Sequence, residues 1–296
     1  MNRTRMHADE VWTSPDLVRR LLRSRFPRWA DLPLALVPSY GTDHDVYRLG
    51  ERLCVRMPRI GWASGQAERE AAWLPRLAPH LPLALPVQVG LGRPAEGYPF
   101  VWSVYEWLPG DNANGTIDDH ERAAADLAGF VAAMRRVDTA DAPPRARGAR
   151  GGALAENDEQ VRRAIHGLGD RVDGAALTRS WEESLAAPTW DHDAWVHGDL
   201  LPGNLLVDAG RLSAVIDWGG LNAGDPACDL QPAWNVFSGR SRALFLSALG
   251  TDEGAYLRGR GWTLYQAVTA LDYYRETNPG MVRQVSHALA QVLAES

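Results

Sequence analysis

The chain changes character at Leu108-Pro109-Gly110. Before this break, short segments with strand-like residues alternate with turn residues, and only two stretches show helical spacing. After it, long alanine- and leucine-rich stretches with helical spacing dominate. A chain of 296 residues is long enough for two such parts. We therefore expect an α+β protein with a β-rich N-lobe at residues 1–106, a hinge at 107–110, and a larger, mostly helical C-lobe at 111–296.

Turn and capping residues place the elements of the N-lobe. Ser14 followed by Pro15 predicts a helix that runs to Phe26, because serine caps helices and proline suits their first position. The dipeptide Gly50-Glu51 lies between two strand-like runs and predicts a hairpin. The remaining pattern predicts a helix at 62–77 and strands at 86–91 and 100–107.

The C-lobe is predicted to be helical with one small hairpin. Strand-like runs at 205–207 and 212–216 flank a turn at Asp208-Ala209-Gly210. The Pro-, Gly-, Arg- and Ala-rich segment 139–152 favours a mobile loop. Helical spacing covers 118–137, 156–167, 175–187 and most of the chain beyond Cys228, with a break at 278–280.

Composition narrows the partners and the compartment. All 31 basic residues are arginine, the net charge is −6, and no concentrated basic stripe is present, so we expect no nucleic-acid partner. No apolar run approaches the ~18 residues of a membrane span, and the N-terminus lacks a secretory pattern. Two distant cysteines, Cys54 and Cys228, fit a reducing compartment. We expect a cytoplasmic monomer or homodimer without a membrane partner.

The densest polar motif lies in the C-lobe. Residues 196–204 read Val-His-Gly-Asp-Leu-Leu-Pro-Gly-Asn, and the second strand of the hairpin then ends at Asp217-Trp218-Gly219. This order places Asp199, Asn204 and Asp217 at the rim of one hairpin. Two oxygen ligands in such a place suit Mg²⁺, and a third carboxylate that binds no metal can accept a proton from a hydroxyl group. The set fits phosphoryl transfer from a nucleotide.

The motif resembles the catalytic and metal-binding loops of kinases. With glycine after the histidine, His-Gly-Asp-Leu-Leu-Pro-Gly-Asn is similar to the aminoglycoside phosphotransferase family, which are antibiotic kinases with a bilobal protein-kinase-like fold. The resemblance covers nearly the whole chain, because the order of lobes also matches. It implies that Asp199 is the catalytic base, that His197 orients the loop, and that Asn204 and Asp217 hold Mg²⁺.

The resemblance also implies a nucleotide site in the N-lobe for ATP or GTP. The segment 39–44, with Gly41 and Thr42, takes the place of the phosphate-binding loop, although it holds only one glycine. Arg56 stands where the family has a lysine, and arginine can still clamp phosphate oxygens. Its carboxylate partner is predicted to be Glu70, with Glu68 as the alternative.

The resemblance further implies that the hinge lies at the end of this lobe and that the backbone of Glu106 and Leu108 pairs with the adenine edge.

Further residues of the C-lobe are given supporting or substrate roles. Asp225 is a predicted helix cap and Asp229, in the family's Asp-Pro-x-x-Asp pattern, is predicted to brace the catalytic loop. Asp272 and Glu276 are four residues apart and are predicted to share a helix face. The resemblance implies that acidic residues of this region line a pocket for a cationic acceptor. Trp234 is predicted to face the same pocket.

The predicted reaction moves the γ-phosphoryl group of ATP or GTP to a hydroxyl of a small-molecule antibiotic, which confers resistance. An aminoglycoside is favoured, and a macrolide or nucleoside antibiotic is possible. One alternative is a metabolic kinase for a small alcohol such as choline, homoserine or a sugar. The other is a nucleotide-binding pseudokinase, which Arg56 and the glycine-poor loop favour and the intact Asp199, Asn204 and Asp217 oppose.

Overall fold

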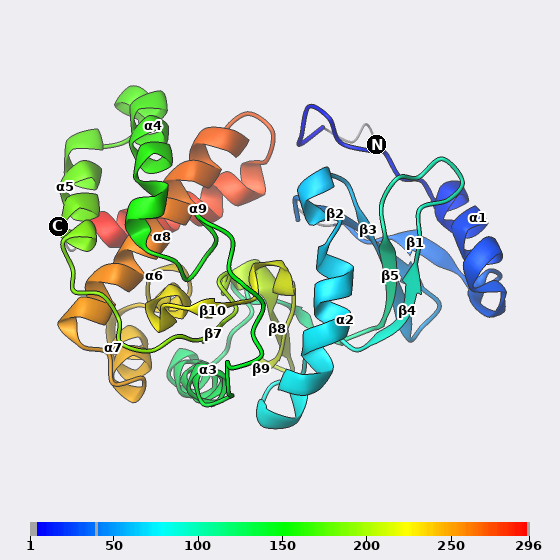
Figure 1. Ribbon diagram of the computed structural model, residues 1–296, viewed down its shortest axis with the longest axis horizontal. Coiled ribbons are helices and arrows are strands. Elements are labelled where there is room, and N and C mark those ends of the chain that lie inside the picture. The colour runs from blue at the N-terminus through cyan, green and yellow to red at the C-terminus, as the bar shows by residue number, and fades with distance from the viewer. Residues whose placement is uncertain (1–4, 39–40, 295–296) are drawn as a thin grey trace. The chain divides into compact units, whose positions relative to one another are not determined.

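The computed structural model describes residues 5–38 and 41–294. The chain divides into two compact units, which Figure 1 colours by position along the chain. The N-terminal unit comprises Met1–Pro79 and Ala84–Pro109, and the C-terminal unit comprises His80–Leu83 and Gly110–Ser296.

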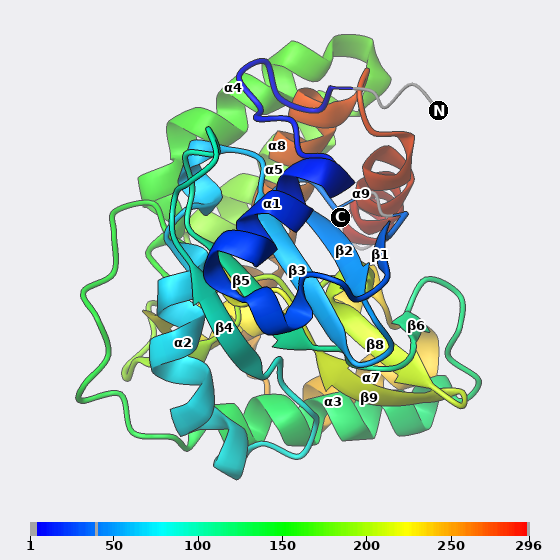
Figure 2. The same ribbon diagram turned by 90° about the vertical axis from the view of Figure 1, so that its right-hand side faces the viewer.

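An antiparallel five-stranded sheet forms the N-terminal unit, in the order β1-β2-β3-β5-β4 (Figure 2). The hairpin predicted around Gly50 is confirmed, because β2 and β3 pair from His44↔Pro58 to Leu49↔Leu53. In chain order, the strands are β1 (Leu34–Leu36), β2 (His44–Leu49), β3 (Leu53–Pro58), β4 (Gln88–Gly92) and β5 (Trp102–Glu106).

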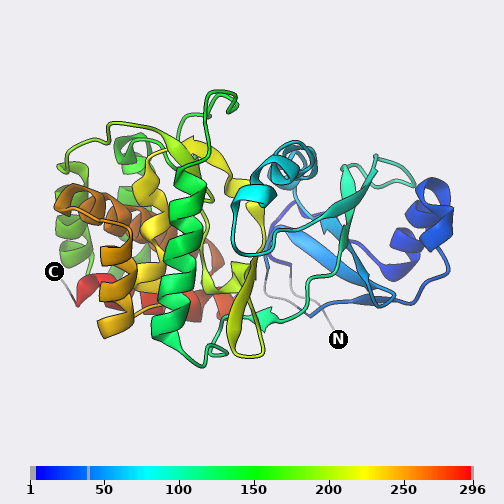
Figure 3. The ribbon, with the colours of Figure 1, turned by 90° about the horizontal axis from the view of Figure 1, so that it is seen from below.

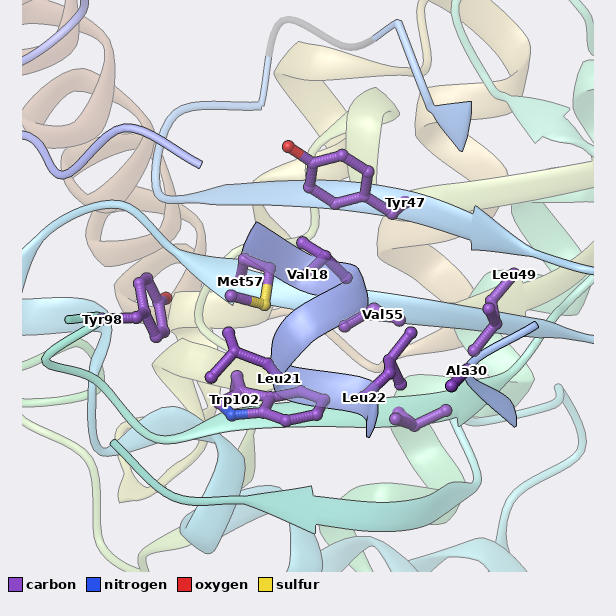
Figure 4. Close-up of a cluster of buried hydrophobic side chains, with 11 residues drawn as sticks. Val18, Leu21, Leu22, Ala30, Tyr47, Leu49, Val55, Met57, Tyr98 and Trp102 are labelled. Atoms are coloured by element: carbon purple, nitrogen blue, oxygen red, sulfur yellow. The ribbon is translucent and has the colours of Figure 1, made fainter. Parts of the chain in front are cut away.

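Helix α1 (Pro15–Arg25) covers one face of this sheet, as Figure 2 shows. The predicted start is confirmed: Pro15 is the first helical residue, and the Ser14 Oγ accepts a hydrogen bond from the Leu17 N–H at 3.2 Å. Its apolar side packs against alternate residues of the strands (Figure 4). Burial of one such side chain contributes about 1.5–3 kcal/mol. The core contains Val18, Leu21, Leu22, Ala30, Tyr47, Leu49, Val55, Met57, Tyr98, Trp102 and Val104.

Helix α2 (Gln66–Leu77) contacts the side chains that point the other way from the same strands. Because successive strand residues alternate between faces, Arg56 and Tyr105 point away from the α1 core while Val55 and Val104 face it. Both Arg56 and Tyr105 form hydrogen bonds with Glu70 of α2. The helix begins four residues later than predicted, since residues 61–63 form a separate 3₁₀ turn.

Packed helices make up most of the C-terminal unit. The long helix α3 lies beside α7, and α8 packs against α4, α5 and α9 (Figure 3). The predicted helices are confirmed with shifts of a few residues at their ends. They are α3 (His120–Arg135), α4 (Asp158–Leu168), α5 (Gly174–Leu185), α6 (Pro232–Asn235), α7 (Gly239–Ala248), α8 (Glu253–Tyr274) and α9 (Pro279–Leu293).

Two small sheets carry the polar motif of this unit. The predicted hairpin is confirmed as β8 (Leu205–Asp208) and β9 (Arg211–Val215), and the two-residue strand β6 (Asp111–Asn112) extends it. Strand β7 (Ala194–Val196) pairs with β10 (Asn222–Gly224). In the sequence, β7 ends just before the polar motif at residues 197–204, and β8 begins just after it. In the part of the chain that the structure describes, no helix is both long and apolar enough to cross a bilayer.

Candidate active site

Strand β7 leads directly into the polar loop of the C-terminal unit. The loop runs from His197 to a short 3₁₀ turn at Pro202–Asn204, after which β8 begins. Asp229 holds its first turn, because the carboxylate accepts the backbone N–H groups of both His197 and Gly198 at 2.8 Å. The predicted brace is thus observed as a pair of hydrogen bonds from a residue 32 positions away in the chain.

His197 connects this loop to the strand that ends at Asp217. The ring is fully buried and lies edge-on to Trp218, with the two centroids 4.7 Å apart. Its Nδ1 accepts the backbone N–H of Asp199 at 3.1 Å, so Nε2 carries the proton and donates to the Ile216 carbonyl at 3.1 Å. Both nitrogens of this fully buried ring are therefore used, one within the loop and one on the strand end before Asp217.

The carboxylate of Asp199 is held by three donors. Its Oδ2 accepts from the Asn204 side-chain amide at 2.9 Å, and its Oδ1 accepts from Arg150 and from Gln266 of α8. A carboxylate offers about four acceptor positions, two on each oxygen. Within the described chain, one position therefore remains, on Oδ2. A hydroxyl group donated to that oxygen would meet a carboxylate whose orientation is already fixed.

Asn204 and Asp217 lie next to one another at the open end of the β8–β9 hairpin. Leu205 and Val215 form the last residue pair of the hairpin at this end. Next to this pair, the Ile216 N–H donates to the Asn204 carbonyl at 2.9 Å. Asp217 adopts a left-handed conformation with φ 63° and ψ 73°, which is uncommon outside glycine and clusters at functional sites. The chain therefore turns sharply where the predicted metal ligand lies.

These two side chains fit a Mg²⁺ ion. Among the described residues, the Oδ1 oxygen of Asn204 accepts no hydrogen bond, and the Asn204 backbone is hydrogen-bonded to Ile216, the residue before Asp217. Mg²⁺ in phosphoryl-transfer sites takes one or two such oxygens and completes its shell with water and substrate phosphates. In residues 5–38 and 41–294, no group of three His, Cys, Asp or Glu side chains has the geometry of a metal site. The donor set thus suits a metal shared with phosphates.

Two buried carboxyl groups support the loop from behind. Burial raises the pKa of Asp229, and the two backbone N–H groups of the loop counteract that shift. Burial also raises the pKa of Asp225, whose carboxylate accepts from Arg258 at 2.9 Å and 3.3 Å. Asp225 caps the following turn through the Ala227 N–H at 2.9 Å, with Pro226 in the first position, as predicted.

In the N-terminal unit, Arg56 is paired with Glu70. The Arg56 Nη1 donates to the two carboxylate oxygens of Glu70 at 3.0 Å and 3.2 Å. Gln66 and the Tyr105 hydroxyl also donate to this carboxylate, which is almost completely buried. Burial raises the pKa of Tyr105, so its phenol remains a donor. Glu68, the alternative partner, is exposed on the same helix.

The predicted phosphate-binding segment is partly described. Ser39 and Tyr40 lie outside the described residues. The carbonyls of Gly41 and Thr42 lie within hydrogen-bond distance of the Arg59 Nη1, at 3.3 Å and 3.4 Å. The His7 ring also contacts the Thr42 carbonyl, at 3.1 Å. A buried arginine next to β3 therefore fixes this turn, which carries little glycine of its own.

The predicted adenine-binding residues follow β5. Glu106 is its last residue and donates its backbone N–H to the Val87 carbonyl at 2.9 Å. Trp107 then donates to the Arg52 carbonyl at 2.8 Å. Within the described chain, the N–H of Leu108 has no acceptor, so it is available to a ligand.

The structure differs from the sequence interpretation at the predicted acceptor residues. Trp234 is 0% exposed and packs against Tyr256 with centroids 5.3 Å apart, so its ring belongs to the core. Asp272 is in the last turn of α8 and pairs with Arg275 at 2.6 Å. Glu276 lies beyond the end of α8, where an arginine faces it at 3.7 Å. The two acidic groups are therefore balanced by neighbouring cations.

Sequence reasoning missed Arg150 and Gln266, the two further partners of Asp199. The segment 139–152 has no helix or strand, as expected, but hydrogen bonds fix its end: the Gly151 carbonyl accepts the Asp225 N–H at 2.7 Å. Its composition gave no sign that one of its arginines reaches the catalytic loop. Gln266 lies on α8, and the helical spacing of that segment did not indicate that this side chain contacts Asp199.

Comparison with known proteins shows the family to which the chain belongs. A model described as the phosphotransferase enzyme family matches residues 36–268. The chain belongs to this family. It is accordingly a phosphotransferase of the kinase type, as the resemblance predicted. No curated protein sequence matches significantly.

Solved structures of related fold cover nearly the whole chain. The GDP complex of wild-type aminoglycoside 2′-phosphotransferase-IIIa superposes with a TM-score of 0.74 and 16% identity, over 96% of this chain and 99% of that one. Macrolide 2′-phosphotransferase type I gives 0.63 and 22%, over 95% and 98%. Macrolide 2′-phosphotransferase MphH from Brachybacterium faecium gives 0.60 and 26%, over 95% and 98%. These likenesses confirm the predicted α+β, kinase-like fold.

Proposed function

We propose that this enzyme transfers the γ-phosphoryl group of ATP or GTP to a hydroxyl of a small-molecule antibiotic. The observation that carries the proposal is the hydrogen bonding of the Asp199 carboxylate. Three donors fix its carboxylate and leave one acceptor position on Oδ2, where a hydroxyl can be oriented for attack. The presence of Asp199, Asn204 and Asp217 together opposes the pseudokinase alternative.

The chain's residues divide the work as follows. Asp199 orients the hydroxyl and accepts its proton, Asn204 and Asp217 hold Mg²⁺, and Arg56, held by Glu70, binds phosphate oxygens. Bound Mg²⁺ neutralises charge on the phosphates. The Leu108 N–H and the Glu106 carbonyl receive the base. A relative was solved with GDP and kanamycin and another with ADP, which supports a nucleotide donor here.

The charges of the C-terminal unit bear on which class of antibiotic is the acceptor. The C-terminal unit carries more acidic than basic residues, which favours a cationic aminoglycoside. However, Asp272 and Glu276 are each matched by an arginine, and Arg150 places a cation beside Asp199. These contacts favour an acceptor with few positive charges, such as a macrolide.

Mass spectrometry of reaction mixtures tests the proposal. Protein, Mg²⁺ and ATP or GTP would be incubated with panels of aminoglycosides, macrolides and nucleoside antibiotics, with Asp199→Asn as the control. We expect the mass of one phosphoryl group to be added to members of one panel, and no addition with the variant. Bound nucleotide with no product on any panel would contradict the antibiotic assignment, and choline, homoserine and sugars would be tested next.

A further inference from the structure

Arg150 reaches the catalytic loop from a segment that has no regular structure. Its Nη1 donates to the Gly198 carbonyl at 2.8 Å and forms an ion pair with Oδ1 of Asp199. The side chain lies so close to the loop that a Cβ on Gly198 would meet the Arg150 Cβ at 2.9 Å. Gly198 also has φ +76°, a conformation that suits glycine. The glycine of the His-Gly-Asp motif thus makes room for this arginine.

The segment on both sides of Arg150 is anchored. Before it, Glu156 accepts from the Gly148 N–H at 2.7 Å and from Arg145 at 3.0 Å, and these bonds lower the pKa of the Glu156 carboxyl. After it, the Gly151 carbonyl accepts the Asp225 N–H. Arg150 is therefore presented by a fixed backbone, and the ion pair is part of how the segment folds.

Among the described residues, the Arg150 guanidinium contacts protein groups through one nitrogen, Nη1. In the described part of the chain, Nε and Nη2 donate to no protein group, and the side chain is 30% exposed. Arginine presents five N–H donors in a planar fork, and such a fork binds phosphoryl oxygens well. An unused edge of this fork therefore lies beside the carboxylate that would receive the acceptor hydroxyl.

We propose that Arg150 is a catalytic residue of this enzyme: it fixes Asp199 through Nη1 and binds the phosphoryl group in transfer through Nε and Nη2. This inference rests on the proposed function. In the step, the hydroxyl oxygen forms a bond to the γ-phosphorus while the bond to the β–γ bridging oxygen breaks, and that electron pair leaves with the nucleoside diphosphate. The hydroxyl proton passes to Oδ2 of Asp199 and from there to solvent. The guanidinium stabilises the charge on the phosphoryl oxygens.

Arg150→Ala tests the inference, with Arg147→Ala as the matched control. Arg147 is an exposed arginine of the same segment. We expect kcat of Arg150→Ala to fall about 10²- to 10³-fold, as when one preorganised donor is removed, while the Kd for nucleotide changes less than about threefold. Guanidinium chloride should restore part of the lost rate, and the same concentration of sodium chloride should not. Arg150→Lys should recover little, because lysine lacks the fork.

A binding measurement adds a readout that does not depend on turnover. Fluoroaluminate bound with Mg²⁺ and ADP mimics the phosphoryl group in transfer, so the wild-type enzyme should bind ADP more tightly when fluoroaluminate is present. This increase in ADP affinity should be lost in Arg150→Ala and kept in Arg147→Ala. A kcat within about threefold of the wild type, or a higher one that would indicate an inhibitory latch, would overturn the inference. So would a loss of rate that guanidinium does not restore and that accompanies a lower melting temperature. If the wild-type enzyme phosphorylates no acceptor, the proposed function fails instead.

Discussion

The two units hold their polar clusters in different ways. In the N-terminal unit, Arg56 and Glu70 are 14 positions apart and are brought together by one strand and the helix that follows it. In the C-terminal unit, Asp199 is reached by Gln266 from 67 positions away and by Arg150 from a loop. The first cluster joins neighbouring elements of the N-terminal unit, and its most distant member is Tyr105 of β5, 35 positions from Glu70. The second cluster joins residues spread from Arg150 to Gln266, so it requires most of the C-terminal unit to be folded. Changes to the second should therefore affect catalysis through several elements.

Among the metal-binding and supporting positions, the largest effect is expected at Asp217 in the C-terminal unit. Asp217→Ala removes a carboxylate that we assign to Mg²⁺, and the lost charge stabilisation of several kcal/mol should lower transfer about 10³-fold. Mg²⁺ titrations of the transfer rate would measure this. Asp208→Ala, an exposed aspartate at the end of β8, is the control and should leave the rate unchanged. An unaltered Mg²⁺ dependence in Asp217→Ala would contradict the assignment.

The pair in the N-terminal unit should contribute to stability. Glu70→Ala leaves Arg56 in a mostly buried place without its carboxylate, which should lower the free energy of unfolding by about 3 kcal/mol. Glu68→Ala, on the same helix but exposed, should change it by less than about 0.5 kcal/mol. Urea unfolding of both variants gives the two values. Equal losses of unfolding free energy in the two variants would show that the contact of Glu70 with Arg56 does not stabilise this unit.

A smaller effect is expected where Asp229 holds the catalytic loop. Asparagine has one acceptor oxygen, so Asp229→Asn would leave one of the two loop N–H groups facing an amide donor, at a cost of about 1–3 kcal/mol. We expect a lower kcat with little change in the Kd for nucleotide. Asp193→Asn, at an exposed position before β7, is the control. A change in nucleotide affinity alone would mean that Asp229 does not act through the loop.

The smallest effect concerns the two thiols, one in each unit. Burial raises the pKa of Cys54 to about 11 and that of Cys228 well above its usual value, so both thiols stay protonated at neutral pH. The thiolate is the reactive form. Neither cysteine should react with a thiol reagent in the native enzyme at pH 8, and both should react in denaturant. Rapid reaction of one thiol would show that its unit opens readily.

The same contrast explains what the sequence could predict. The hairpin around Gly50, the cap at Ser14 and the motif from His197 to Asn204 depend on neighbouring residues, and their local spacing sufficed. Arg150 was missed because its role depends on a loop folding back onto Gly198, which no periodic pattern encodes.

Trp234 was misplaced for a similar reason. Helical spacing predicts on which face of a helix a residue lies, but it does not predict which other element packs against that face. The Trp234 ring is buried in the core against Tyr256. Asp272 and Glu276 were predicted to line a pocket for a cationic acceptor, yet each already pairs with an arginine. Arg275 pairs with Asp272, and Arg171, which is far away in the sequence, pairs with Glu276.

The most direct test compares one variant from each cluster. Turnover and the Kd for nucleotide would be measured for Asp199→Asn and for Arg56→Gln. We predict that Asp199→Asn lowers turnover about 10³-fold or more and leaves the Kd within a few-fold, whereas Arg56→Gln weakens nucleotide binding. Near-normal turnover in Asp199→Asn would contradict the account, because the network around that carboxylate would then serve some purpose other than phosphoryl transfer.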